Sequence, residues 1–466
     1  MRVAFLFAVI VCVSAVQAQD RSEAVREVLE EAEITGLGAA IVEDGRISWA
    51  GAFGVRSAAT NPAVDTSTVF EAASLTKPVV ALVALQLVEE GLLDLDRPLA
   101  EYVEYPDLAH TGRGGEITAR MVLSHTSGLP NWRPQGGQLD LRNAPGSTFG
   151  YSGEGFVYLQ RAMEAVARRP LHTMVEDRVF VPLGMPSSSL VWREAFGPFV
   201  AVGHADDGTP LDKFTPGEAN AAYSLHTTAA DYARFLAAFL RGWSLSDAIW
   251  QDAVSRQADA GDGLAWGLGW GLQRTAQGES VWHWGDNRGY KAFVAGYPGQ
   301  GRGFVFFSNS DNGMLALHRL VEVLDGTTHP SVPWLNYERF DNPSFQVGRT
   351  LRAAMADSTG PSLREAYRGA QDRFPRSAFT EDTLNDLGYR LLRAGRYEDA
   401  IEVFELNVQE YPDASNPYDS LGEAFMVSGQ LEKALLNYRV SVDLDPGNTN
   451  GRAMIARLEA ELARQR

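Results

Sequence analysis

The sequence predicts a mixed α/β domain, with an antiparallel sheet built from both ends of the domain and a helical subdomain inserted between them, followed by an all-α tail. Three observations predict this architecture. Strand-like apolar runs lie near both ends of residues 19–327, and long helical stretches lie between those runs. Beyond about residue 360 a helical pattern repeats itself.

The expected strands are short apolar runs bounded by turn residues. Asp44-Gly45 joins the first two, and residues 298–301 join the last two, and both connections have the composition of hairpin turns. The alternating glycines within residues 266–272 suit a strand that passes close to another backbone. The runs are residues 38–42, 47–53, 266–272, 290–297 and 303–308.

Two helices are expected from their endings. Residues 74–90 are followed by Gly91, and residues 228–240 by Gly242, and glycine is typical just after the last helical residue. The helix that follows Ser74 is apolar nearly all round, so we expect it to be buried.

The end of the chain differs in composition from the first domain. Residues 328–360 carry proline, asparagine and scattered aromatic residues, which predicts a linker. Residues 361–466 repeat with a period of 34, resemble the tetratricopeptide repeat, and imply paired helices and a protein partner. The recurring pairs are Leu387 and Leu421, Gly388 and Gly422, Gly395 and Gly429, Ala400 and Ala434, Phe404 and Tyr438, and Pro412 and Pro446.

Charge and targeting limit the function further. The formal net charge of −18 argues against a nucleic-acid partner, because binding phosphates requires a basic surface.

Residues 1–18 are typical of a signal peptide, with Arg2, an apolar run and small residues before the cleavage site. The run is short for a membrane span, so we expect a secreted or periplasmic protein with no stable span after cleavage. A retained anchor is the alternative. Cys12, the only cysteine, would leave with this segment.

Ser74-Leu75-Thr76-Lys77 is the strongest indication of chemistry. A serine hydroxyl needs a base within hydrogen-bond reach, and Lys77 lies on the same helix face one turn after Ser74. Burial of this helix start would lower the pKa of Lys77 towards that of a working base. Taken alone the pattern has low specificity, because a helix cap followed by an exposed lysine looks the same.

Further stretches give this pattern a context. Ser74-Leu75-Thr76-Lys77, then Tyr151-Ser152-Gly153, then His283-Trp284-Gly285 resemble in order the three motifs of penicillin-recognising serine enzymes. These are the class C β-lactamases, D-Ala-D-Ala carboxypeptidases and related esterases. Residues 123–129, 182–185 and 227–231 are also similar to the family. The resemblance spans about residues 25–315 and implies the β-lactamase/transpeptidase-like fold.

The resemblance implies a role for each matched residue. Ser74 would form an acyl-enzyme, and Tyr151, its pKa lowered by Lys77, would pass the proton to the leaving group. The N–H groups of Ser74 and Asp286 would form the oxyanion hole, and His283 would face the carboxylate or leaving group of the substrate.

Two positions depart from the family pattern and affect the substrate. Gly153 stands where an asparagine would bind an acylamide, and His283 stands where lysine is common. Both departures leave room for an esterase or an amide hydrolase of D-amino-acid peptides. We therefore expect a serine hydrolase acting on a small ester, peptide or β-lactam, with Gly153, His283, Gly285 and Asp286 at the substrate.

Other chemistries lack their motifs. The sequence has no Gly-x-Ser-x-Gly elbow and no His-Glu-x-x-His, and its eight histidines are dispersed, so we expect no metal and no organic cofactor. The alternative from another class is a binding protein that holds a cell-wall or peptide ligand while the tail recruits a partner.

Overall fold

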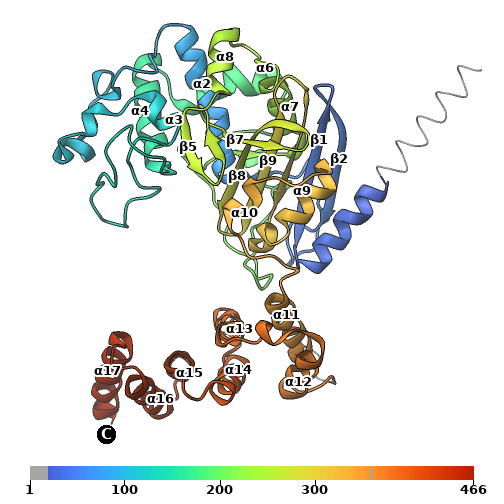
Figure 1. The fold of residues 1–466 in the computed structure, drawn as a ribbon, viewed down its shortest axis with the longest axis vertical. Coiled ribbons are helices and arrows are strands. Elements are labelled where there is room, and N and C mark those ends of the chain that lie inside the picture. The colour runs from blue at the N-terminus through green and yellow to red at the C-terminus, as the bar shows by residue number, and fades with distance from the viewer. Residues whose placement is uncertain (1–18, 357–358, 466) are drawn as a thin grey trace, which may run out of the picture. The chain divides into compact units, whose positions relative to one another are not determined.

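The structure is a computed structural model that describes residues 19–356 and 359–465. The chain divides into two compact units, the first ending at Glu338 and the second beginning at Arg339 (Figure 1). Residues 1–18, which carry the predicted signal peptide and Cys12, lie outside the described residues.

The first unit is built around one antiparallel sheet, which confirms the predicted fold class. Strands from the two ends of the unit meet in the middle, where β1 pairs with β10 from Leu37 opposite Ser308 to Val42 opposite Gly303. In spatial order the strands are β2 (Arg46–Gly54), β1 (Gly36–Glu43), β10 (Arg302–Ser308), β9 (Tyr290–Tyr297), β8 (Gly278–Asn287), β7 (Gly271–Thr275), β6 (Leu264–Trp266) and β5 (Ala258–Gly261).

Helices cover both faces of this sheet. Phe307 packs against Tyr232 of α7 (Ala229–Phe239), whereas Phe304 packs against His329, which follows α9 (Leu317–Asp325). Phe304 and Phe307 lie three residues apart on β10, so their side chains point to opposite faces. The sheet is therefore buried on both sides, in agreement with the fully buried side chains of β9.

The inserted helices surround α2 (Thr76–Glu89), which is buried from Thr76 to Leu87. The predicted burial of this helix is confirmed. The remaining helices of the insertion are α3 (Ala119–Leu123), α4 (Gly153–Ala167), α5 (Leu171–Val175), α6 (Val181–Leu183) and α8 (Asp247–Ala253).

The strand predicted at residues 266–272 is interrupted. β6 ends at Trp266 and β7 begins at Gly271. Between them Gly269 has a φ of +87°, and a Cβ at this position would lie 2.3 Å from the Cβ of Ala81 on α2. The close backbone approach that the glycines predicted is present, but it bends the chain out of the sheet.

The second unit is all-α. Helices α13 and α14 pack as one pair, and α15 and α16 as the next. In both pairs a glycine faces an aromatic ring of the partner helix: a Cβ on Gly388 would lie 2.4 Å from Phe404, and one on Gly422 would lie 3.1 Å from Tyr438. The helices are α11 (Pro343–Ala356), α12 (Leu363–Arg373), α13 (Glu381–Arg393), α14 (Tyr397–Glu410), α15 (Ser415–Val427), α16 (Leu431–Leu444) and α17 (Thr449–Gln465).

Much of the predicted linker, residues 328–360, is folded. His329 is buried and bonds the carboxylate of Asp325 at 2.8 Å, and Trp334 of α10 (Ser331–Leu335) donates to the carbonyl of Ala260 at 3.0 Å. These contacts attach residues 329–337 to the first unit. Within residues 19–356 and 359–465, no helix is both long and apolar enough to cross a membrane.

Candidate active site

Ser74 lies on a tight turn that leads directly into α2. The 3₁₀ turn Ala73–Leu75 precedes Thr76, whose hydroxyl donates to the Ala73 carbonyl at 2.7 Å and accepts from the N–H of Leu225 at 3.0 Å. Ala73 has a φ of +47°, a left-handed conformation that costs a residue with a side chain on the order of 1–3 kcal/mol. The fold thus holds a strained residue immediately before the half-buried Ser74.

Lys77 is the base that the geometry offers to Ser74. Its Nζ lies 3.0 Å from Ser74 Oγ and 2.9 Å from the carbonyl oxygen of Ala222, and its side chain is 0% exposed. Burial lowers the pKa of Lys77 from 10.5 to about 7, because a buried ammonium loses its hydration. The amine is therefore available as a proton acceptor near neutral pH.

Tyr151 lies beside this pair. Lys77 Nζ lies 4.9 Å from the centre of the Tyr151 ring, and the ring packs on Trp284 at 4.5 Å. Its buried hydroxyl makes no well-formed hydrogen bond among the described residues, although the Ser74 hydroxyl is near enough to lower its pKa slightly. Burial outweighs this effect and raises the pKa of Tyr151. The prediction of a lowered pKa is wrong, because Lys77, whose own pKa is about 7, is already neutral in the pH range in which a tyrosine titrates.

Two neutral histidines complete the wall around Tyr151. Nδ1 of His283 lies 2.8 Å from the Trp284 carbonyl, so Nδ1 carries the proton and Nε2 the lone pair. Burial and, second, the charge of Lys77 lower the pKa of His283 to about 3. His125 packs on the Tyr151 ring at 4.3 Å and accepts from the N–H of Ser152 at 3.1 Å. His125 was not predicted as a site residue.

Gly285 allows β8 to approach the nucleophile. A Cβ on Gly285 would lie 2.5 Å from the Ala72 carbonyl oxygen and 3.2 Å from the Cβ of Ala73. Only glycine lets the strand lie this close to the turn that carries Ser74. The structure thus brings together five of the predicted residues around one point: Ser74, Lys77, Tyr151, His283 and Gly285.

Asp286 extends the site towards the end of the first unit. Its carboxylate accepts from Lys291 at 2.9 Å and from the Tyr337 hydroxyl at 2.6 Å. The side chain of Asp286 is thus fixed by other residues, which leaves its backbone N–H as the group that the sequence analysis assigned to the oxyanion hole. Tyr337 lies within the predicted linker and was missed as a neighbour of the site.

Glu71 is a buried acid near the third motif. It is 4% exposed and accepts from the Asn287 side chain at 3.2 Å. Burial raises the pKa of Glu71 to about 7, against the opposing effect of the Asn287 hydrogen bond. Two groups of the site, Lys77 and Glu71, therefore change charge in the same pH range.

Gly153, the last predicted residue, begins α4. Its N–H donates to both the carbonyl and the side-chain oxygen of Asn131, at 3.1 and 3.0 Å. Asn131 thus fixes the start of the helix two residues after Tyr151. The backbone of Gly153 is not in the left-handed region.

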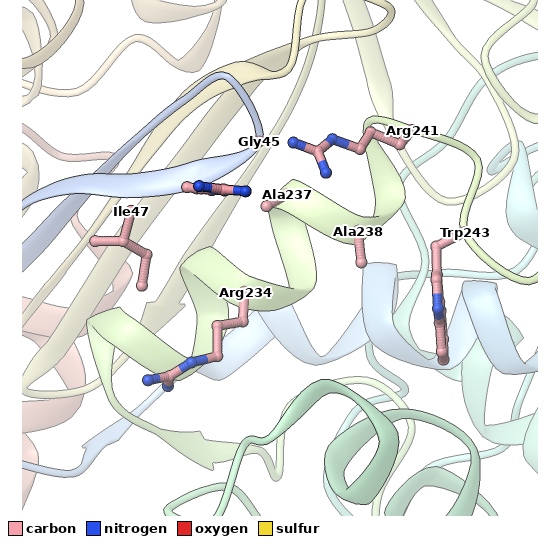
Figure 2. Close-up of a pocket in the computed structure, with 8 residues that line it drawn as sticks. Gly45, Ile47, Arg234, Ala237, Ala238, Arg241 and Trp243 are labelled. Atoms are coloured by element: carbon pink, nitrogen blue, oxygen red, sulfur yellow. The ribbon is translucent and has the colours of Figure 1, made fainter.

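A separate groove lies between the β1–β2 turn and α7 (Figure 2). Figure 2 shows the guanidinium group of Arg241 directed at Gly45, and this group donates to the carbonyl oxygen of Asp44. Arg234 is paired with Asp231 at 2.6 Å. The groove contains none of the predicted site residues, and Arg241, just after α7, attaches this helix to the hairpin. Across the described residues, no three histidine, cysteine or acidic side chains cluster as a metal site would require.

Comparison with known proteins places the chain in a family. The sequence profile of the beta-lactamase family matches residues 22–325, so the chain belongs to the beta-lactamase family. Penicillin-binding protein 4 of Amycolatopsis lactamdurans is 27% identical over 316 residues, which cover 61% of this chain and 82% of that protein. Esterase EstB of Burkholderia gladioli is 29% identical over 197 residues, which cover 36% of this chain and 50% of that protein.

A solved structure shows the same fold. The octameric penicillin-binding protein homologue from Pyrococcus abyssi matches with a TM-score of 0.58 and 21% identity, over 72% of this chain and 81% of that chain. The resemblance read from the three motifs is confirmed at the level of family and fold. Membership of this family indicates a function of the serine-hydrolase type.

Proposed function

We propose that this protein is an exported serine hydrolase in which Ser74 forms an acyl-enzyme and Lys77 is its base. One observation carries the proposal: Lys77 Nζ lies 3.0 Å from Ser74 Oγ, in a site that is dry enough to bring the pKa of the amine to about 7. A nucleophile and a base within hydrogen-bond reach, with the base neutral at working pH, meet the requirement for acyl transfer.

Acylation then follows from the positions of the groups. Neutral Lys77 accepts the hydroxyl proton as Ser74 Oγ bonds to the substrate carbonyl carbon. The N–H groups of Ser74 and Asp286 stabilise the resulting oxyanion. The Tyr151 phenol, kept protonated by its raised pKa, donates its proton to the leaving group as the bond to that group breaks, and regains one from Lys77. Water then attacks the carbonyl carbon of the acyl-enzyme, with the same proton transfers running in the opposite direction, and Ser74 is released.

The polar groups around Ser74 favour a neutral ester as the substrate. Gly153 has no side-chain amide to bind an acylamide, and His283, with a pKa of about 3, has no positive charge for a substrate carboxylate. A D-alanyl peptide carries both an acylamide and a carboxylate, as a penicillin does, whereas a simple ester carries neither. We therefore place esters before β-lactams and peptides in the expected order of turnover.

The other parts of the chain fit an exported enzyme with a recruiting tail. The sequence of residues 1–18 supports secretion or transfer to the periplasm, and we propose a catalytic domain over residues 19–327. The paired helices of residues 361–466, with Gly388 and Gly422 in register 34 residues apart, support a tetratricopeptide-type tail that binds a protein partner. We propose that catalysis needs no metal and no organic cofactor.

A fluorophosphonate probe tests the nucleophile directly. The wild-type protein should be labelled covalently. Ser74→Ala should abolish labelling and lower kcat for p-nitrophenyl acetate about 10^6-fold. Ser147→Ala is the matched control, because Ser147 is an exposed serine four residues before Tyr151, and this variant should label normally. Nitrocefin and a D-alanyl dipeptide tested beside the ester set the order of substrates. A protein that no acylating probe labels would be a binding protein and not an enzyme.

A further inference from the structure

The space beside the second motif is filled by an indole ring. A Cβ on Gly153 would lie 2.7 Å from two ring carbons of Trp132 and 3.0 Å from the carbonyl oxygen of Asn131. A side chain at position 153 could not keep its place without moving Trp132. Trp132 therefore lies where the acylamide-binding side chain of the second motif would lie, and glycine at 153 makes room for it.

Trp132 begins a row of three aromatic rings. Its ring packs edge-on against Tyr223 at 5.6 Å, and Tyr223 in turn lies 5.8 Å from Phe214. Trp132 is 43% exposed and Phe214 is 38% exposed. Aromatic rings packed to complete a core are buried, whereas the two ends of this row face solvent. We call Trp132, Tyr223 and Phe214 the aromatic row.

The aromatic row runs up to the catalytic groups. Tyr223 follows Ala222, whose carbonyl oxygen accepts from Lys77 Nζ at 2.9 Å. Trp132 covers Gly153, which lies two residues after Tyr151. The aromatic row therefore lies beside the catalytic groups, on the side of the second motif.

The chemistry of the row differs from that of an amide-binding site. Aromatic faces bind apolar and aromatic groups through dispersion and hydrophobic burial, and offer no donor or acceptor comparable to an amide. Arg133, the cation next to Trp132, is already paired with Glu154 at 2.8 Å and with Asp107 at 2.6 Å. The row is thus suited to a hydrophobic group of the substrate.

We propose that the aromatic row is a subsite for an aromatic or other bulky apolar acyl group, with Trp132 as the residue that determines specificity. This inference rests on the proposed function and names its substrate class: esters of hydrophobic carboxylic acids without an acylamide. The acyl group is assigned because the second motif faces the acyl portion of the substrate, as the family resemblance implies.

Two pairs of esters test the proposal. The acyl pair is p-nitrophenyl acetate and p-nitrophenyl phenylacetate, and the alcohol pair is ethyl acetate and benzyl acetate. The wild-type protein should prefer phenylacetate in kcat/KM, and Trp132→Ala should reduce that preference about ten-fold, the size expected for losing apolar contact in a pocket. Trp132→Phe should keep most of the preference, and the alcohol pair should not respond.

Further variants keep the test independent of folding. Phe214→Ala should lower the acyl preference several-fold, and Gly153→Ala should do so by displacing the Trp132 ring. Trp243→Ala is the matched control, because Trp243 lies in the separate groove of Figure 2 and should leave both ester ratios unchanged.

The outcomes separate this inference from the proposed function. The subsite alone would be overturned if Ser74 turns over p-nitrophenyl acetate but the acyl preference is unchanged by substitution of Trp132 and Phe214. A response confined to the alcohol pair would also overturn it, since the row would then bind the leaving group. If no ester is hydrolysed and Ser74 is not labelled, the proposed function and the subsite are both wrong.

Discussion

Lowering the pH should stop acylation through the protonation of Lys77. Burial brings the pKa of this lysine from 10.5 to about 7, and only its neutral form can accept the Ser74 proton. At pH 7 an exposed lysine would be neutral in about one molecule in 3,000, whereas about half of the Lys77 population is neutral. Burial therefore supplies roughly 10^3 in the concentration of active base at neutral pH.

The profile of kcat/KM against pH measures this group in the free enzyme. For p-nitrophenyl acetate, read at the isosbestic wavelength of the product, kcat/KM should rise through a pKa of about 7 and fall about 100-fold from its plateau by pH 5. His283, with a pKa of about 3, should not contribute over this range.

Glu71 is the necessary control, because burial also raises its pKa to about 7. Glu71→Gln removes this second titration and should leave the rising limb in place. Lys77→Arg should be inactive at every pH, because arginine does not deprotonate in proteins. A rising limb above about pH 9 would mean an ordinary lysine, and a limb that disappears in Glu71→Gln would assign it to the acid. Either result would refute the reasoning.

Two further predictions concern packing and the boundary of the first unit. Gly285→Ala places a Cβ 2.5 Å from the backbone that precedes Ser74. This variant should lower the free energy of unfolding by about 1–3 kcal/mol and kcat/KM at least about ten-fold. Gly217→Ala is the control and should change neither quantity, because the space around Gly217 is open. A wild-type melting temperature for Gly285→Ala would contradict the close approach. A chain ending at Glu338 should keep kcat on a small ester within about a factor of three, because the acid–base groups lie inside the first unit. A chain ending at residue 327 loses the buried contacts of the following segment and should melt at least about 5 °C lower than the chain ending at Glu338; equal melting temperatures would contradict that role.

The sequence was sufficient where one local pattern determines the structure. The Ser74 to Lys77 spacing predicts a shared helix face, and the two hairpins predict the strands that come from both ends of the first domain, because turn chemistry and helix periodicity act over a few residues. His125 could have been found, since it lies inside the family-like stretch 123–129, but nothing in that stretch indicated contact with the Tyr151 ring.

The remaining features depend on contacts between distant segments. Trp132 and Gly153 meet only in the folded protein, and no spacing rule connects them. The direction of the Tyr151 pKa depends on how dry the site is and on the charge of Lys77, and neither can be read from residue types. Trp334 and Tyr337 belong to the scattered aromatic residues of the expected linker. Their contacts are with Trp284 and Asp286 of β8, and the sequence does not show that β8 lies beside them.

The pairing of β1 with β10 also has a consequence for how the protein is made. Leu37 pairs with Ser308, so 271 residues (308 − 37) must be synthesised before the first strand meets its partner. At ribosomal rates of about 5–20 residues per second this delay is on the order of 15–50 s. During that time the apolar strands β1 and β2 form at most a two-stranded hairpin, which is marginal in water. The newly made chain therefore depends on protection from aggregation until the last strand of its sheet has emerged.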